Sequence, residues 1–205
     1  IWIDSDADGK WLVLKNQDSF TKGELLPEGN VSLQHFGYDI ILSHDDKRLV
    51  VTAPDNQSGK VYIYDRPNNK SSWLLTQIIM MPDDIFTISN TEKFGASVDI
   101  TYSGKFLAVG IPNASDLLSI VQNSTHYGNI LGFDSGLTNQ GAVAIYKYNI
   151  INRLYELDVV LGSSDPLANE RFGNKVKIAD DGTNIWMFVT SKDYNNDTGR
   201  VQVFK

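Results

Sequence analysis

Residues 94–112 read FGASVDITYSGKFLAVGIP, and this stretch decides the fold class. Its first eight residues alternate apolar and polar side chains, which is the period of a half-buried β-strand. A polar turn at residues 102–104 is followed by the apolar run 106–109, which is typical of a strand covered on both faces. The run stops at Pro112, because proline has no N–H for the ladder. The stretch therefore predicts two antiparallel strands joined by a tight turn.

The same pattern occurs three times, and a Phe-Gly dipeptide opens each copy. A third strand follows a glycine in every copy, and a fourth strand follows in the first two, at residues 73–79 and 154–161. A sheet with two apolar faces cannot bury both alone, so the repetition predicts sheets that stack on one another. The opening dipeptides are Phe36-Gly37, Phe94-Gly95 and Phe172-Gly173, and the later glycines are Gly59, Gly141 and Gly199.

The order Phe-Gly, strand, turn, Leu-Ala-Val-Gly-x-Pro, then Gly-x-Val-x-Ile-Tyr resembles the FG-GAP repeat. This repeat builds the β-propeller of integrin α-subunits and occurs in many bacterial and viral surface proteins. The resemblance covers nearly the whole chain. It implies an all-β fold of four-stranded antiparallel blades around an axis, here two complete and two partial. Calcium-binding members carry an acidic loop between strands one and two; this chain has short turns there, so we expect no calcium sites of the family type.

The resemblance implies one β-propeller region over residues 1–205. The expected strands are fewer than the roughly sixteen that close a four-bladed propeller, so we expect part of a larger propeller or assembly. A complete β-domain that is not a propeller is the alternative. The expected parts are the end of a preceding blade at 1–15, a blade at 36–81, a blade at 94–161 with an insertion at 113–140, and a partial blade at 172–205.

Composition excludes several classes of function. With 18 Lys and Arg against 25 Asp and Glu, the net charge is −7, and no basic stripe is present, so we expect no nucleic-acid partner. No apolar run reaches the roughly 18 residues that a membrane span needs, so we expect no membrane insertion. The chain has no cysteine, which excludes disulfides, thiol catalysis and cysteine-bound zinc.

The sharpest local motif is Asp4-Ser5-Asp6-Ala7-Asp8-Gly9. Alternate carboxylates before a glycine are how calcium loops begin, so Asp4, Asp6 and Asp8 are candidate calcium ligands. Lys15 stands where an EF-hand loop would have its bidentate glutamate. A calcium site and a solvated hairpin turn are both open at this point, and we expect no other cofactor.

We predict that the protein is not an enzyme. His35, His44 and His126 lie in separate segments without metal-ligand spacing, and no Gly-x-Ser-x-Gly elbow is present. Adjacent carboxylates such as Asp45-Asp46 fit turn preference better than acid–base catalysis. We therefore expect no catalytic residues.

Loop lengths predict where binding occurs. Loops after the first and third strands of each copy are short, whereas those after the second and fourth are long, so one end of the sheets carries the long loops. We call this end the long-loop face; the insertion 113–140 is its main feature. We predict a non-enzymatic structural or adhesion module, extracellular at a cell surface or in a virion, that contacts protein subunits or a cell-surface ligand there. The alternative is a glycan-binding or glycan-cleaving propeller, whose cleavage needs two carboxylates about 5–10 Å apart.

Overall fold

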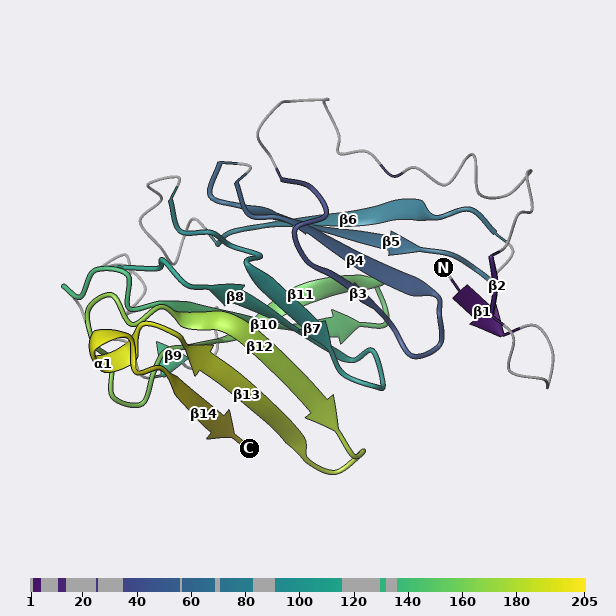
Figure 1. Ribbon diagram of the computed structural model, residues 1–205. Helices are drawn as coiled ribbons and strands as arrows, with labels where there is room; N and C mark the ends of the chain where they lie inside the picture. The colour runs from purple at the N-terminus through teal and green to yellow at the C-terminus, as the bar shows by residue number, and fades with distance from the viewer. Residues whose placement is uncertain are drawn as a thin grey trace. The chain divides into compact units, whose positions relative to one another are not determined.

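The computed structural model is all-β, with one short helical segment among the described residues (Figure 1). The chain divides into two compact units, Ile1–Val31 and Ser32–Lys205, and each is described by itself. In the first unit, β1 (Trp2–Asp4) pairs antiparallel with β2 (Trp11–Val13), with Trp2 opposite Val13. The structure describes residues 2–4, 11–13, 25, 35–55, 57–68, 71–82, 91–115, 130–131 and 136–205.

The second unit contains three sheets, which we call the first, middle and third sheets. The first sheet has the order β3-β4-β5-β6 and the third has β12-β13-β14. The middle sheet has the order β7-β8-β10-β11, and β9 joins its edge in parallel to β11. The bounds are β3 Ile40–Leu42, β4 Arg48–Ala53, β5 Lys60–Asp65, β6 Leu74–Met80, β7 Ser97–Ile100, β8 Phe106–Ile111, β9 Ile130–Leu131, β10 Ala142–Asn149, β11 Leu154–Leu161, β12 Phe172–Asp180, β13 Ile185–Ser191, α1 Tyr194–Asp197 and β14 Arg200–Phe204.

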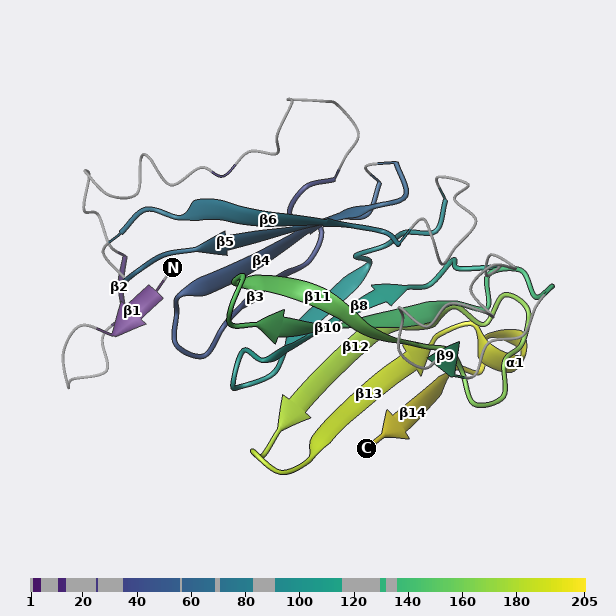
Figure 2. The same ribbon diagram turned by 180° about the vertical axis from the view of Figure 1, so that it is seen from behind.

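The expected antiparallel sheets of four, four and three strands are confirmed. Each copy uses its Phe-Gly strand at one edge and adds the later strands outward in chain order, apart from β9 (Figure 2). Nothing in the sequence predicted β9, which comes from the insertion 113–140. No sheet closes among the described residues, so the fold is a stack of open sheets and not a demonstrated propeller.

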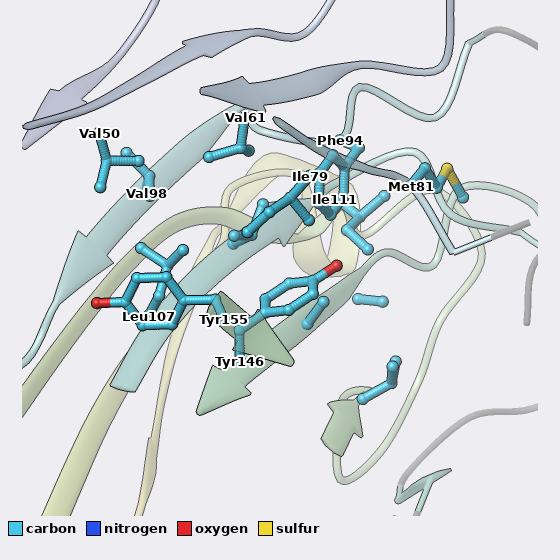
Figure 3. Packing of buried hydrophobic residues seen from close by; sticks show 14 of the residues in the cluster. Val50, Val61, Ile79, Met81, Phe94, Val98, Leu107, Ile111, Tyr146 and Tyr155 are labelled. Carbon is cyan, nitrogen blue, oxygen red and sulfur yellow. The ribbon is translucent and has the colours of Figure 1, made fainter. Parts of the chain in front are cut away.

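The middle sheet buries both of its faces. Leu107 and Val109 of β8 pack toward the first sheet, in one cluster with Val50 and Val61. Ala108, between them on the strand, packs toward the third sheet. This alternation follows from the period of two, which sends successive side chains to opposite faces. Figure 3 shows the first cluster, in which Phe94, Ile79 and Ile111 pack together. The stack is thus held by two apolar layers, one on each side of the middle sheet.

The Phe-Gly pairs lock neighbouring sheets together. Phe94 and Phe172 are fully buried. A Cβ added to Gly59 would lie only 2.0 Å from the carbonyl oxygen of Phe94. A Cβ added to Gly141 would lie 2.1 Å from the carbonyl oxygen of Phe172. No side chain fits at such a distance, so the two glycines form notches that receive the next Phe-Gly strand. The phenylalanines fill the apolar layers and the notches fix how closely the sheets approach.

Polar side chains also link the edge strands β3, β7 and β12 across the stack. The Asp39 carboxylate accepts the N–H of Val98 at 3.1 Å, one sheet further on. Asp99 accepts the N–H of Ile178 at 2.8 Å and lies 3.3 Å from the ammonium of Lys177. The edge strands are therefore fastened by side-chain acceptors for backbone donors.

The third sheet keeps one apolar face open. Its strand β13 has an apolar run that predicts cover on both faces, and this prediction is wrong for the described residues. Trp186 and Phe188 are 37% and 43% exposed, whereas the equivalent Phe106 and Ala108 of the middle sheet pack against the third sheet. The reason is that no further sheet among the described residues covers this side. We call the surface of Trp186, Phe188, Val201 and Val203 the open face.

Candidate functional site

The predicted calcium ligands lie almost entirely outside the described residues. Asp4 ends β1, and Asp6 and Asp8 belong to the undescribed segment between β1 and β2. The calcium site therefore stays a prediction. Within the described part of the chain, no three His, Asp or Glu side chains gather into a metal-binding group.

The insertion 113–140 is anchored at its base. Gln140 is buried and donates to the carbonyl oxygen of Ser115 at 2.8 Å, and Asn139 N–H donates to the Ser115 hydroxyl at 2.9 Å. Ala114 is also buried. Residues 116–129 and 132–135 lie outside the described residues. The two ends of the insertion are held together, and Asn139 at one of them donates to Asn169 in the loop between β11 and β12 at 3.0 Å.

The long-loop face carries a shallow cavity of about 580 Å³ between the β11–β12 loop and α1. One wall is Asp193, which pairs with Arg171 at 3.2 Å and Lys192 at 3.5 Å. Its charge is therefore already balanced by neighbouring cations. The lining residues are Leu167, Ala168, Asn169, Asp193, Asn195, Asn196 and Asp197.

A larger groove of about 740 Å³ lies at the opposite end, between the first and middle sheets. Two short turns form its sides, β3–β4 and β7–β8, and both lie at the same end of the stack in Figure 1. We call it the turn groove. Four of its lining residues are Lys or Arg and two are Asp, in a chain with a net charge of −7. It is lined by Ser43, His44, Asp45, Lys47, Arg48, Asp65, Arg66, Tyr102, Ser103, Gly104, Lys105, Tyr148 and Ile150.

Arg48 forms the base of the turn groove. Its Nε donates to Asp65 at 2.7 Å and its Nη2 donates to the other carboxylate oxygen at 3.1 Å, which is the bidentate geometry of a strong pair. The guanidinium also lies 4.2 Å from the Tyr148 ring and 5.1 Å from the Tyr155 ring. Burial works against its charge, but Asp65 and Tyr155 outweigh that effect and raise the pKa of Arg48 above its ordinary value.

Tyr155 ties this base to the rim. Its hydroxyl donates to the carbonyl oxygen of Gly104, in the β7–β8 turn, at 2.6 Å and accepts from Arg48 at 3.3 Å. Burial raises the pKa of Tyr155 to about 12, although Arg48 acts in the opposite direction. The hydroxyl therefore keeps its proton, and the turn is held in one position relative to the first sheet.

The rim of the turn groove is aromatic. Tyr102 is 66% exposed, and its ring centroid stands 3.8 Å from that of His44 on the other turn. The turn itself is braced from the third sheet, since Ser103 Oγ donates to Asp180 at 2.6 Å. The hydrogen bond to Ser103, outweighing the effect of burial, lowers the pKa of Asp180. An exposed aromatic ring thus stands on a turn that is hydrogen-bonded to the third sheet.

The carboxylates of Asp39 and Asp99, which link the edge strands, already have hydrogen-bond and ion-pair partners. Asp39 accepts the N–H groups of Ile40 and Val98 and lies 3.7 Å from the Lys175 ammonium. Asp99 is bonded as described above, to Ile178 and Lys177. Both carboxylates stabilise the stack and are already bonded to cations and backbone donors.

Sequence reasoning missed two features. A residue with a basic side chain in the left-handed region precedes every Phe-Gly: His35, Lys93 and Arg171, with φ of 49°, 64° and 57°. His35 and Lys93 both pair with Asp55. The signal that could have predicted these ion pairs is the basic residue that precedes Phe-Gly in every copy of the repeat. The turn groove could not be predicted from the sequence in this way, because neither of its two turns has an unusual sequence when taken by itself.

Comparison with known proteins gives little further information. No family model matches the chain, and no curated protein matches it. Among solved structures, the chain is similar to a functionally unknown protein from Desulfotomaculum acetoxidans DSM 771, with 12% identity and a TM-score of 0.29, over 83% of this chain and 69% of that one. A similarity this low carries no argument. None of the described residues forms a helix that is long and apolar enough to cross a membrane.

Proposed function

We propose that the chain is a non-enzymatic structural or adhesion module of FG-GAP-like propeller blades in an extracellular, cell-surface or virion protein. Its partners are other protein subunits or a surface ligand, with the long-loop face as a contact surface. The resemblance in the repeats supports the propeller. The stacking of three sheets through the same notch and the same apolar layers supports it independently.

The open face carries the structural part of this proposal, the stacking of further sheets. Trp186 and Phe188 occupy the positions of Phe106 and Ala108, which in the middle sheet lie against the next sheet. Gly199 occupies the position in its repeat that Gly59 and Gly141 occupy in theirs, and its φ is 73°. A Cβ added to Gly199 would have the carbonyl oxygen of Lys192 as its nearest neighbour, at 3.5 Å. The third sheet thus offers both an apolar layer and a vacant notch. We assign a further sheet of the same repeat as their occupant.

The opposite side of the stack presents a matching surface. Tyr38, Ile40 and Leu42 of the first sheet are 58%, 60% and 42% exposed. Their equivalents Ala96, Val98 and Ile100 in the middle sheet are buried, and Val98 and Ile100 pack in one cluster with Val50 of the preceding sheet. A second copy of the chain can therefore place its first sheet on the open face, head to tail.

Sedimentation of the isolated chain tests this proposal. The weight-average mass should rise with protein concentration, and Phe188→Lys should abolish the rise because it places a charge in the apolar contact. Ile151→Lys, at a 90% exposed turn position, is the matched control and should associate as the wild type does. A wild-type chain that stays monomeric at millimolar concentration, or an unaffected Phe188→Lys variant, would refute the stacking role.

A further inference from the structure

The turn groove holds two exposed lysines, and the charge of Lys47 also acts on Asp45. Lys47 comes from the β3–β4 turn and Lys105 from the β7–β8 turn, and both are exposed. Neither forms an ion pair with a described residue, whereas Arg48 is paired with Asp65 and Arg66 donates to the carbonyl oxygen of Asp46. The lining thus has four basic side chains against two acidic ones, and the two lysines contribute to this excess of positive charge from two sides of the groove.

The aromatic rim adds a flat apolar surface to the same groove. Tyr102 is held against His44 and is mostly exposed, and Ile150 on the β10–β11 turn is 81% exposed. Exposed aromatic rings that are fixed before binding lose little entropy when a flat ligand face lies on them. The groove is thus built to receive a ligand with both an apolar face and negative charge.

The groove also offers a hydrogen-bond acceptor. Asp45 Oδ1 accepts from the Ser43 hydroxyl at 2.6 Å and from the Lys47 N–H at 3.2 Å, while its Oδ2 has no hydrogen-bond donor among the described residues. The bond from Ser43, against a smaller effect of burial, lowers the pKa of Asp45, so this oxygen is a charged acceptor at neutral pH. A ligand with hydroxyl donors satisfies it, whereas a purely acidic group is repelled.

We propose that the turn groove binds an acidic saccharide, with the sugar ring on Tyr102, its carboxylate at Lys47 and Lys105, and a ring hydroxyl at Asp45. A saccharide of this kind brings the three features together: a flat C–H face, hydroxyl donors and a carboxylate. A peptide of acidic residues alone brings charge and N–H donors but no flat C–H ring face for Tyr102, so the lining favours the sugar. The assignment goes beyond the stacking role, and concerns the opposite end from the long-loop face.

Titration followed by amide NMR shifts tests the proposal on the full chain. The probes are trigalacturonate, 3′-sialyllactose and a hyaluronan tetrasaccharide, with maltotriose as the neutral comparison and a tetraglutamate peptide as the acidic one. At least one acidic sugar should bind and shift the amides of residues 102–105. It should bind about tenfold more tightly than maltotriose and than the peptide, which corresponds to about 1.4 kcal/mol.

Variants locate the contacts. Tyr102→Ala should weaken binding about tenfold, and Lys47→Gln or Lys105→Gln about threefold each, in line with single exposed stacking and charge contacts. Lys192→Gln, at an exposed lysine of the long-loop face, is the matched control and should bind as the wild type does. Phe188→Lys should also bind normally, which separates this proposal from the stacking role.

Three results would overturn it. The first is that no acidic sugar binds at 10 mM. The second is that shifts appear away from residues 43–47 and 102–105, or that Tyr102→Ala binds as the wild type does. The third is that the peptide binds as tightly as the best sugar, which would make the turn groove a peptide site.

Discussion

Asp99 shows how one polar side chain fastens two sheets. It lies on β7, is only 7% exposed, and accepts the N–H of Ile178 on β12. That donor is buried, and a buried N–H without a partner costs about as much as a lost hydrogen bond. Asp99 also lies beside the Lys177 ammonium. One carboxylate therefore satisfies the backbone of the next sheet and balances a charge.

Asp99→Ala should destabilise the fold by about 2–3 kcal/mol, because it leaves the Ile178 N–H buried without an acceptor. Urea unfolding followed by tryptophan fluorescence gives the free energy. The matched control is Asp158→Ala, an exposed carboxylate on β11, which should change it by less than about 0.5 kcal/mol. Equal losses in the two variants would mean that Asp99 does not link the sheets.

The notch glycines allow a cleaner comparison. Gly141 and Gly136 have similar φ, 84° and 92°, but an added Cβ would lie 2.1 Å from the Phe172 oxygen at Gly141 and would meet nothing within 4 Å at Gly136. Gly136→Ala should cost about 1–2 kcal/mol, from backbone strain alone. Gly141→Ala should cost at least about 2 kcal/mol more, since the sheets must separate. Thermal unfolding measures both, and similar losses would contradict the notch.

The notch glycines and Asp99 differ in how far their roles could be predicted from the sequence. The Phe-Gly and Gly positions recur in register, so their role as scaffold could be predicted from repetition. Asp99 has no equivalent carboxylate in the other copies, and its partner N–H lies 79 residues further along the chain. A single sequence does not show which donor a lone aspartate meets.

At the scale of elements, the contact between the first and middle sheets depends on Arg48 and Tyr155. Arg48 comes from β4 and Tyr155 from β11, and the tyrosine hydroxyl reaches the turn between β7 and β8. A charged group, two rings and a turn are thus joined in one cluster. Arg48, Tyr148 and Gly104 of this cluster line the turn groove.

Tyr155 gives the fold a pH dependence. The folded protein holds the Tyr155 proton up to about pH 12, while an unfolded chain releases it near the ordinary value of 10.0. The stabilisation is therefore complete below about pH 10 and is lost as the pH rises to about 12, a change of about 2–3 kcal/mol. Urea unfolding of the wild type and of Tyr155→Phe should show a stability difference that shrinks by this amount between pH 9 and 12. A constant difference would contradict the buried hydroxyl.

The elements explain why the fold could be predicted further than the site. Alternation and turn residues are local, so the strands and their order within each sheet, apart from β9, followed from the sequence. The turn groove arises between two turns of different sheets, and loop length pointed to the opposite end. Its lining residues become neighbours only after stacking.

At the scale of the whole molecule, the stack repeats one kind of interface between sheets, and its two outer sides have the features of that interface without a described partner. Each interface combines an apolar layer with a notch that receives a Phe-Gly strand. The open face and Gly199 offer the same features, and Tyr38, Ile40 and Leu42 offer the complementary surface. Heterologous surfaces of this kind form rings or open chains, depending on whether the rotation closes.

The most direct measurement of this central claim is sedimentation of two complementary variants, alone and mixed. Phe188→Lys disables the open face, and Ile40→Lys disables the first sheet, so each variant alone should be monomeric. An equimolar mixture should form a one-to-one dimer and nothing larger, because it contains one intact open face and one intact first sheet. A mixture that remains monomeric while the wild type associates would show that the sheets do not stack head to tail, and would contradict the account.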